Sequence, residues 1–553
     1  MINGTIIWNA LCFSDEEPEA DSHQWCLTDI QYMNRLFENV PCPSCATDSL
    51  VIRRGSVASR MGFAYPITMC CTNCEFDNTV MSSPRSETGS YDVNDISTLF
   101  FNQMGLSYKA QDKFAGFFGM KGLHRKTYAK KEKKIIDTLV GVTDNILEQS
   151  AILVKENYEV PLDDLCNVTV SFDGSWHKRG HTSLYGIAAV IEVNTGLILD
   201  YTVLSKYCHM CSLKETEYKG KETAEFQRWL PTHLCCINYV GSSNAMETEA
   251  ARILWGRSEE RGFRYTGFLS DGDSKAYTVV SNLNIYGQEY PIEREECVNH
   301  AHKRMGGALR KLRKEKCLGG KGQGKLTDPM CDFFQRMYRK AIKDNVGNPE
   351  GMRHAIFATL FHCMSTDERP HHIRCPPGAN SWCFYQKAEA LGEVPGSHKT
   401  NLNHYVRCDI AKYMVAIYER MADPALLQRL SKGKTQNSNE SFHSVVWAHC
   451  PKRVFVGKRK LDGAVASAVS SYNAGQRGLA MAMAHLNIEV NIVTEAYLEH
   501  MDDLKEKQAR HASNATHLQK RRVKLAAQKA ERSQLSNLEG ATYGPGLEGA
   551  MDS

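Results

Sequence analysis

The sequence predicts a multidomain α/β protein, and three observations support that fold class. The chain has 553 residues, which at roughly 100–200 residues per domain gives three or four domains. Hydrophobic residues make up 42% of the chain and charged residues 24%, a composition that is typical of globular proteins and excludes wholesale disorder. Apolar strand-like segments between 166 and 205 and near 265–270 are combined with segments of helical periodicity, which favours a mixed α/β architecture.

Local patterns divide the chain into successive parts. In order, these are an acidic segment at 1–38, a cysteine-rich strand-like module at 39–82, a helical domain at 92–160, a strand-rich core at 165–485 with insertions at about 205–245 and 320–432, and a polar helical tail with a Gly-rich, disordered end at 486–553. Within the core, the turn Asn194-Thr195-Gly196 between two apolar runs predicts an antiparallel meander. Helices are expected at 327–363 and 404–430, and one long helix is expected from 486 to about 535.

Composition also bounds the compartment and the partners. No run of about 18 apolar residues occurs, so no transmembrane helix is expected. The amino-terminal residues lack a basic segment followed by a long apolar stretch, so no secretory signal is expected. The net charge of +4 is too small to indicate nucleic-acid binding by itself. Twenty cysteines in a chain without an export signal predict zinc sites in a cytosolic or nuclear protein rather than a disulfide framework.

The amino-terminal cysteines predict a zinc ribbon. Cys42-Pro-Ser-Cys45 and Cys71-Thr-Asn-Cys74 are two C-x2-C knuckles on either side of a strand-rich stretch, and Cys70 is an alternative to Cys71. Each knuckle presents two thiolates, and together they complete a tetrahedral site with no open position for a substrate. The zinc is therefore expected to be structural, and four buried free thiols are the less favoured interpretation.

A second cluster is expected in the insertion near 205–245. Cys208-His-Met-Cys211 is followed by His233 and Cys235, which supply the third and fourth ligands of a zinc site. Cys236 is an alternative to Cys235. This zinc would close the insertion or order a loop that contacts the substrate.

A third zinc site is possible by spacing. Cys297-x2-His300 and His372-x2-Cys375 mirror one another, with Cys383 nearby, and together they offer two cysteines and two histidines. The alternative is that His300 is a hydrogen-bonding residue beside the active site and that Cys375 belongs to a hydrophobic core. The sequence does not decide between these two interpretations.

Three acidic residues are candidates for a catalytic site. Asp173 ends one apolar strand, Asp271 follows another, with Asp273 as the reserve, and Glu440 opens a helical stretch. Each alone is explained as a turn or a helix start. Together, carboxylates from two strand ends and one helix can hold two Mg²⁺ ions for phosphoryl transfer.

These motifs resemble those of Mutator-like DNA transposases. The resemblance spans about residues 40–485 and rests on Asp173-Gly-Ser-Trp-His, Ser270-Asp271, Cys297-Val-Asn-His300 and Asn437-Ser-Asn-Glu440. Members of this family use a DDE catalytic core. The resemblance implies an RNase H-like mixed sheet flanked by helices, with a helical insertion, preceded by the zinc ribbon and the helical domain. It also implies that Asp173, Asp271 and Glu440 are the catalytic triad and bind Mg²⁺ or Mn²⁺.

The resemblance implies metal-dependent cleavage and strand transfer of DNA at the ends of a mobile element. The partners would be double-stranded DNA, as element ends and target, and further copies of the chain in a homo-oligomer. A nuclear location is expected, and the basic run at 519–524 is compatible with nuclear import. Two alternatives remain open: a domesticated, non-catalytic nuclear protein that binds zinc and DNA, and a metal-dependent nuclease without strand transfer.

Two basic segments are candidate DNA contacts. Between His302 and Lys325, nine Lys or Arg residues accompany a single acid, Glu315, just after the second catalytic strand. The other segment follows the aromatic stretch at 114–120 and is explained equally well by a solvated helix face. The residues expected to contact DNA phosphates are Lys126, Lys130, Lys303, Arg304, Arg310, Lys311, Arg313 and Lys314.

Overall fold

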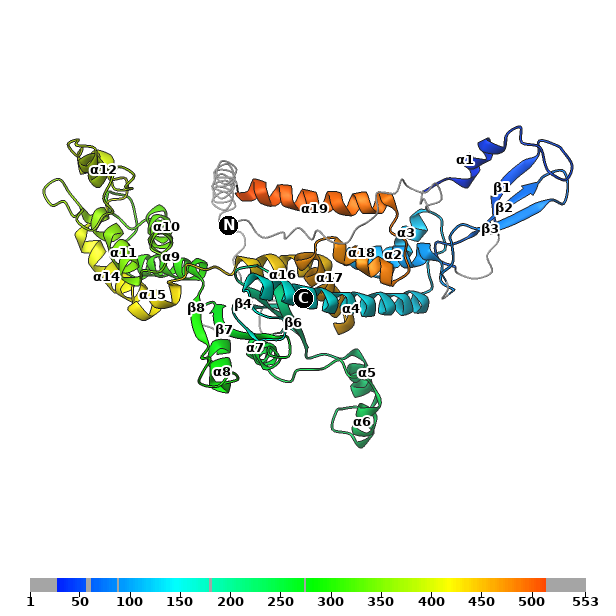
Figure 1. The fold of residues 1–553 in the computed structure, drawn as a ribbon, viewed down its shortest axis with the longest axis horizontal. Coiled ribbons are helices and arrows are strands. Elements are labelled where there is room, and N and C mark those ends of the chain that lie inside the picture. The colour runs from blue at the N-terminus through cyan, green and yellow to red at the C-terminus, as the bar shows by residue number, and fades with distance from the viewer. Residues whose placement is uncertain (1–26, 56–60, 87–88, 179–181, 273–274, 514–553) are drawn as a thin grey trace, which may run out of the picture.

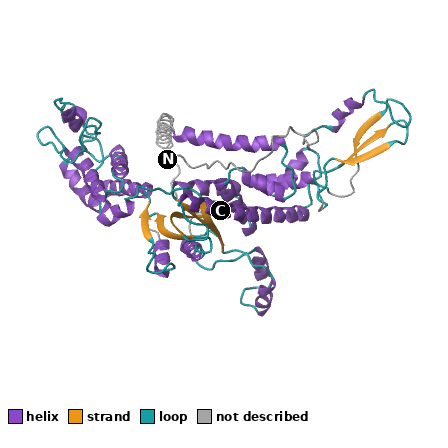
Figure 2. Ribbon diagram, in the orientation of Figure 1, coloured by secondary structure: helices purple, strands orange, loops and turns teal. Residues whose placement is uncertain are grey.

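The computed structural model describes residues 27–55, 61–86, 89–178, 182–272 and 275–513 of a mixed α/β protein (Figures 1 and 2). A central sheet carries helices on both faces, a helical lobe extends to one side, and a small second sheet lies at the opposite end (Figure 1). In the described part, no helix is both long enough and apolar enough to span a bilayer. The segment before residue 27, Asp273 and the basic run at 519–524 lie outside the described residues.

The central sheet has five strands in the order β6-β5-β4-β7-β8. Their bounds are β4 Cys166–Trp176, β5 Tyr185–Glu192, β6 Ile198–Ser205, β7 Phe263–Ser270 and β8 Glu293–Glu296. Strands β4, β5 and β6 pair antiparallel, which confirms the predicted meander. Strands β7 and β8 are parallel to β4 and to β7, respectively. β8 is not predicted from the sequence, because Glu-Arg-Glu-Glu has no apolar alternation.

Both faces of this sheet are covered. On one face, α7 (Met246–Gly256) packs against β4, β5 and β6, with Ala250, Leu254 and Trp255 on its buried stripe. On the other face, α16 (Asn437–His449) and α17 (Lys458–Asn473) cover β4, β5 and β6. β5 is buried along its whole length as a consequence. Helix α8 (Lys275–Leu283) packs beside α7.

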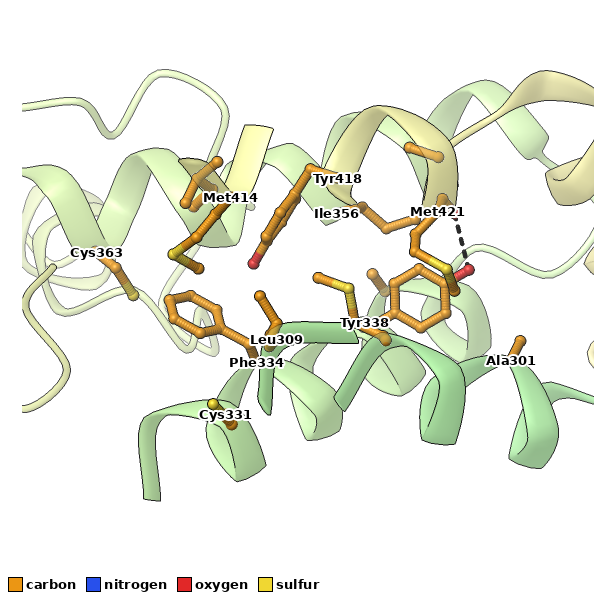
Figure 3. Packing of buried hydrophobic residues seen from close by; sticks show 14 of the residues in the cluster. Ala301, Leu309, Cys331, Phe334, Tyr338, Ile356, Cys363, Met414, Tyr418 and Met421 are labelled. Carbon is orange, nitrogen blue, oxygen red and sulfur yellow. Dashed lines mark hydrogen bonds between the residues drawn. The ribbon is translucent and has the colours of Figure 1, made fainter. Parts of the chain in front are cut away.

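The helical lobe between β8 and α16 has its own hydrophobic core (Figure 3). Its helices are α9 Val298–Glu315, α10 Asp328–Asp344, α11 Pro349–Met364, α12 Phe384–Ala390, α13 His398–Asn401, α14 Cys408–Met421 and α15 Pro424–Leu430. Phe334 and Tyr418 meet in this core, and the Tyr338 hydroxyl donates to the carbonyl of Met421 at 2.9 Å. Each helix expected at 327–363 and 404–430 forms as two helices, because Pro349 and Pro424 each start a new one.

The amino-terminal part combines a small sheet with helices that pack onto the core. The sheet has the order β1-β2-β3, with β1 Leu50–Arg54, β2 Pro66–Cys71 and β3 Asp77–Met81. The preceding helix is α1 Ile30–Met33, and α2 Asp92–Gln103, α3 Tyr108–Phe117 and α4 Arg125–Asn157 follow. Ile135 and Leu139 of α4 share one hydrophobic cluster with Ala466 of α17 and Ala482 of α18 (Arg477–His485). The helices at 92–160 are therefore held directly against the core.

Two further regions complete the fold. The insertion after β6 contains α5 His209–Glu217 and α6 Ala224–Trp229, which extend away from the sheet in Figure 1. The prediction of one helix from 486 onward is wrong at its start. Asn487 adopts a left-handed φ of 56° at the end of α18, and a new helix, α19, runs over Ile492–Ser513.

Candidate active site and metal clusters

The sheet register brings Asp173 and Asp271 together. β4 and β7 are parallel neighbours, and Ser171 of β4 pairs with Leu269 of β7. Each acid stands two residues beyond this pair, so both lie at the same level: Asp271 directly follows β7, and Asp173 lies near the carboxyl end of β4, which continues to Trp176. If each Asp-Gly motif served only as a turn, nothing would require Asp173 and Asp271 to lie side by side.

Helix α16 adds Glu440 to the same end of the sheet. Gln436 donates from Nε2 to the carbonyl of Phe172 at 2.8 Å. The fully buried Asn439 donates from Nδ2 to the carbonyls of Ser171 and Ala189 at 3.3 and 3.4 Å. These bonds fix the first turn of α16 against β4 and β5, and Glu440 is the next residue along that turn. The amide residues that precede the acid are thus the anchors that position it.

The electrostatics of the site follow from the convergence of negative charge. Burial, together with the charges of Glu247, Asp271 and Glu440, raises the pKa of Asp173 to about 7, against a hydrogen bond from the Gly174 backbone. The neighbouring carboxylates therefore lie close enough to disfavour the ionisation of Asp173. A divalent cation relieves this repulsion, and an all-oxygen donor set suits Mg²⁺ or Mn²⁺.

Sequence reasoning missed one acid of this site, Glu247. It stands in the first turn of α7 and approaches Gly174 from the opposite face of the sheet. A Cβ atom on Gly174 would lie 3.4 Å from Glu247 Cγ, at van der Waals contact, so α7 brings this side chain directly against β4. Burial raises the pKa of Glu247 to about 7, and the charge of Asp271 adds to the rise. The only signal in the sequence is an acid at the start of an amphipathic helix, which is far too common to single it out.

Two histidines border the carboxylates. His443 follows Glu440 by one turn of α16, and its Nδ1 lies 3.6 Å from Asp173 Oδ2. Burial and the charge of Lys452 lower the pKa of His443 to about 4, so its ring is neutral near pH 7. Its buried Nε2 has no hydrogen-bond partner in the described structure. His300 Nε2 lies 4.0 Å from Glu440 Oε1, from the first turn of α9.

Two of the three expected Cys/His groups assemble as predicted. Cys42, Cys45, Cys71 and Cys74 form one cluster, and Cys208, Cys211, His233 and Cys235 form the second. Tetrahedral zinc, with Zn–S of about 2.3 Å and Zn–N of about 2.05 Å, places two sulfurs about 3.8 Å apart and a sulfur and a nitrogen about 3.6 Å apart. The observed separations are 3.6 Å for Cys42–Cys74, 3.7 Å for Cys45–Cys71 and 3.6 Å for Cys208–His233. Both clusters are compatible with structural zinc.

The predicted ligand set of the third cluster needs a correction. His372 and Cys375 lie together, but their partners are His362 and Cys383 rather than Cys297 and His300. Cys297 precedes α9, where its sulfur accepts a hydrogen bond from the backbone N–H of Gln436 at 3.3 Å. His300 is directed to Glu440, as described above. The C-x2-H motif therefore belongs to the carboxylate site, while the third cluster lies in the helical lobe.

The basic residues of α9 divide into two groups. Arg304 pairs with Glu296, Arg310 with Asp332, and Arg313 with Asp328. These arginines are engaged in holding α9 to β8 and α10, which makes them weaker candidates for DNA phosphates than expected. Of the eight residues predicted to contact DNA, five lysines are exposed: Lys126, Lys130, Lys303, Lys311 and Lys314, of which Lys311 pairs with Glu315.

Comparison with known proteins identifies the family. The family described as Mutator-like transposase matches residues 25–383, which include β4, β7, α9 and all three Cys/His clusters. Glu440 and α16 lie beyond the matched region. No curated protein matches the chain. Because the match covers well over half of the sequence, this chain belongs to the Mutator-like transposase family.

Proposed function

We propose that this protein is a DDE DNA transposase with an RNase H-like core, and that Asp173, Asp271 and Glu440 are its catalytic residues. The observation that carries the proposal is the convergence of carboxylates from β4, β7 and α16 at one end of the sheet. In an RNase H-like core, the first acid lies on the first strand and the second on the fourth. The strand order, with an antiparallel meander followed by parallel strands, supports this assignment.

The proposed reaction is hydrolysis of a phosphodiester at an element end, followed by attack of the freed 3′-hydroxyl on target DNA. Two divalent cations, when bound, activate the attacking oxygen and stabilise the leaving one. The register between β4 and β7 holds the carboxylates of Asp173 and Asp271 at the same level along the strands. Asn439 and Gln436 fix the turn that carries Glu440. Exposed lysines such as Lys303 bind the DNA backbone beside this end of the sheet.

The proposal extends to partners and location. Double-stranded DNA is the substrate, both as element ends and as target, and two ends processed together require a homo-oligomer. Structural zinc occupies the first two Cys/His clusters. The protein acts in the nucleus, where its substrate lies.

A cleavage assay tests this function. Purified wild type, Glu440→Gln and the exposed-residue control Glu419→Gln receive DNA from the flanks of the protein's own gene, with Mg²⁺ or Mn²⁺. We expect wild type and Glu419→Gln to cut and to join 3′-hydroxyl ends to a second DNA, and Glu440→Gln to bind without cutting. Cuts that are never joined indicate a nuclease. Binding by all three proteins without cuts, on any flanking sequence, indicates a domesticated DNA-binding protein.

A further inference from the structure

The segment between α11 and α14 is folded without a hydrophobic core of its own. From Ser365 to Tyr405, which the structure describes throughout, the buried apolar residues are Cys375, Cys383 and Leu402. Its two helices, α12 and α13, have seven and four residues. The large hydrophobic cluster of the lobe includes Cys363 and Val406 at either end of the segment and nothing between them. Something other than apolar burial must hold these residues in place.

The third Cys/His cluster lies at the centre of this segment. His362 comes from α11, His372 and Cys375 come from the loop that follows, and Cys383 precedes α12. All four side chains are buried, with exposed fractions of 6%, 3%, 4% and 0%. Two thiols and two imidazoles removed from water together are costly unless they are ligands or are fully hydrogen-bonded.

The separations match a tetrahedral metal. His362 Nδ1 and His372 Nδ1 are 3.2 Å apart. Cys375 Sγ lies 3.7 Å from His362 Nδ1 and 3.8 Å from His372 Nδ1, and Cys383 Sγ lies 3.4 Å from His372 Nδ1. Zinc requires about 3.3 Å between two nitrogens and about 3.6 Å between a nitrogen and a sulfur. Two thiolates with two imidazoles in this geometry select zinc over harder cations.

Outside the four ligands, a chain of hydrogen bonds leads from His372 through His398 to Asp367. The carboxylate of Asp367 only accepts, so His398 donates to it from Nδ1 at 2.6 Å. His398 Nε2 lies 2.8 Å from His372 Nε2. A metal bound at Nδ1 of His372 requires the ring proton on Nε2, and His398 is placed to accept that proton in a hydrogen bond. The ring of Tyr385 stacks on His372 at 4.5 Å and fixes its plane.

We propose that His362, His372, Cys375 and Cys383 bind one zinc ion that serves as the core of residues 365–405, and that Asp367 and His398 are positioning residues for His372. The zinc joins α11 to the loop and to α12, and the hydrogen-bonded pair joins α13 to the same centre. The site is structural, because four protein ligands leave no open position. It is separate from the carboxylate site and does not depend on the proposed catalysis.

Metal analysis of the full-length protein tests the ligand set. We expect Cys383→Ser to lose one zinc ion per chain relative to wild type, while the exposed-cysteine control Cys317→Ser keeps the wild-type content. Removal of zinc from wild type with a chelator should open residues 365–405 to limited proteolysis, which also covers the case of a variant that fails to fold. Equal zinc contents in Cys383→Ser and Cys317→Ser would overturn the site. So would cleavage in this segment that is independent of zinc.

Zinc competition tests the positioning pair. We expect Asp367→Asn to weaken zinc at this site by about 10–100-fold, the usual effect of losing an outer partner of a histidine ligand. The neighbouring exposed acid provides the control, Glu368→Gln, which should keep wild-type affinity. With cobalt in place of zinc, the thiolate charge-transfer bands should persist in Asp367→Asn while the ligand-field bands shift, a change that a purely structural role would not cause. Equal affinities for the two variants would refute the role of Asp367 and His398.

Discussion

Asp173, Asp271 and Glu440 reach one end of the sheet from three segments far apart in the chain, whereas each Cys/His cluster closes within one short segment. The acids are held by strand register and by the amides that anchor α16. The cysteines and histidines lie in small local clusters apart from that core: Leu50 packs with Cys42 and Cys71, and Phe226 packs with Cys208 and Cys211. The two kinds of site therefore differ in what holds them: the first depends on the folded core, and the second, in our proposal, depends on a bound zinc ion.

This difference predicts how each kind of site should respond to an amino-acid substitution. Substitution of one carboxylate alters chemistry without unfolding the sheet, because these side chains repel one another and contribute no packing. Substitution of one metal ligand removes the interaction that folds its segment, yet leaves the distant sheet intact.

The largest effect is expected for Asp271→Asn. A neutral amide in place of a metal-binding carboxylate should reduce DNA cleavage by about a thousandfold, equivalent to about 4 kcal/mol of transition-state stabilisation. Thermal stability should not fall, because the substitution removes charge from a repulsive cluster. Cleavage kinetics and thermal melts measure the two quantities. The matched variant is Asp273→Asn, which should cleave normally, and the reverse result would transfer the catalytic role to Asp273.

The second cluster offers a sharper test of local folding. Cys235 lies in the cluster, 3.5 Å from Cys211, while Cys236 is its immediate neighbour. We expect Cys235→Ser to lose one zinc ion and to increase hydrogen exchange in α5 and α6, with the sheet unchanged. Cys236→Ser should retain the zinc. Loss of zinc from Cys236→Ser alone would identify Cys236 as the fourth ligand, and exchange that spreads into the sheet would contradict the separation drawn above.

The same difference explains what the sequence could predict. The ligand sets of the first two clusters follow from spacing, because C-x2-C knuckles close on themselves. The third was predicted with the wrong partners, since His362 is hidden in the apolar pattern of α11 and Cys297 matches a motif that serves the carboxylate site. Pairing Cys297-x2-His300 with the distant His372-x2-Cys375 gave the wrong ligands. Cys383, which is close to Cys375 in the sequence, is in the cluster.

For the carboxylate site, the sequence motifs identified the acidic residues, whereas hydrophobic periodicity identified only the strands. The strands β4 to β7 were predictable from apolar runs, but the register that aligns Asp173 with Asp271 is a tertiary property. Charged β8 carries no strand signal, because it is paired and covered only in the folded protein. Glu247 reaches the site through the position of α7 over Gly174, which no spacing in the sequence encodes.

A smaller effect is expected for the anchor of α16. Asn439→Ala removes three hydrogen bonds of a fully buried side chain: the two donated to the carbonyls of Ser171 and Ala189, and the one accepted from the Ser171 hydroxyl. We expect the free energy of unfolding to fall by about 1–3 kcal/mol. Cleavage should fall by about tenfold as Glu440 loses its position. Denaturant unfolding and cleavage rates measure both, and the exposed Asn437→Ala is the control. Unchanged cleavage in a destabilised Asn439→Ala protein would show that Glu440 does not depend on this anchor.

The smallest effect is expected for Glu247→Gln and depends on pH. The pKa of Glu247 is raised to about 7 in the folded protein, so folding favours the protonated carboxyl. The stability that this proton contributes is fully present below the pKa of the unfolded chain and is lost as pH rises through about 7. In metal-free protein, Glu247→Gln should therefore raise the free energy of unfolding by about 1 kcal/mol at pH 8, after allowance for solvent screening, and by much less at pH 5, just above the unfolded pKa. Urea unfolding at both pH values measures this gain. On the same helix, Glu249 pairs with Arg252 away from the site, so Glu249→Gln should show no such gain at pH 8. Adding Mg²⁺ should cancel the advantage of Glu247→Gln, because the cation screens the same repulsion; a gain that persists in Mg²⁺ would place Glu247 outside the metal-binding carboxylates.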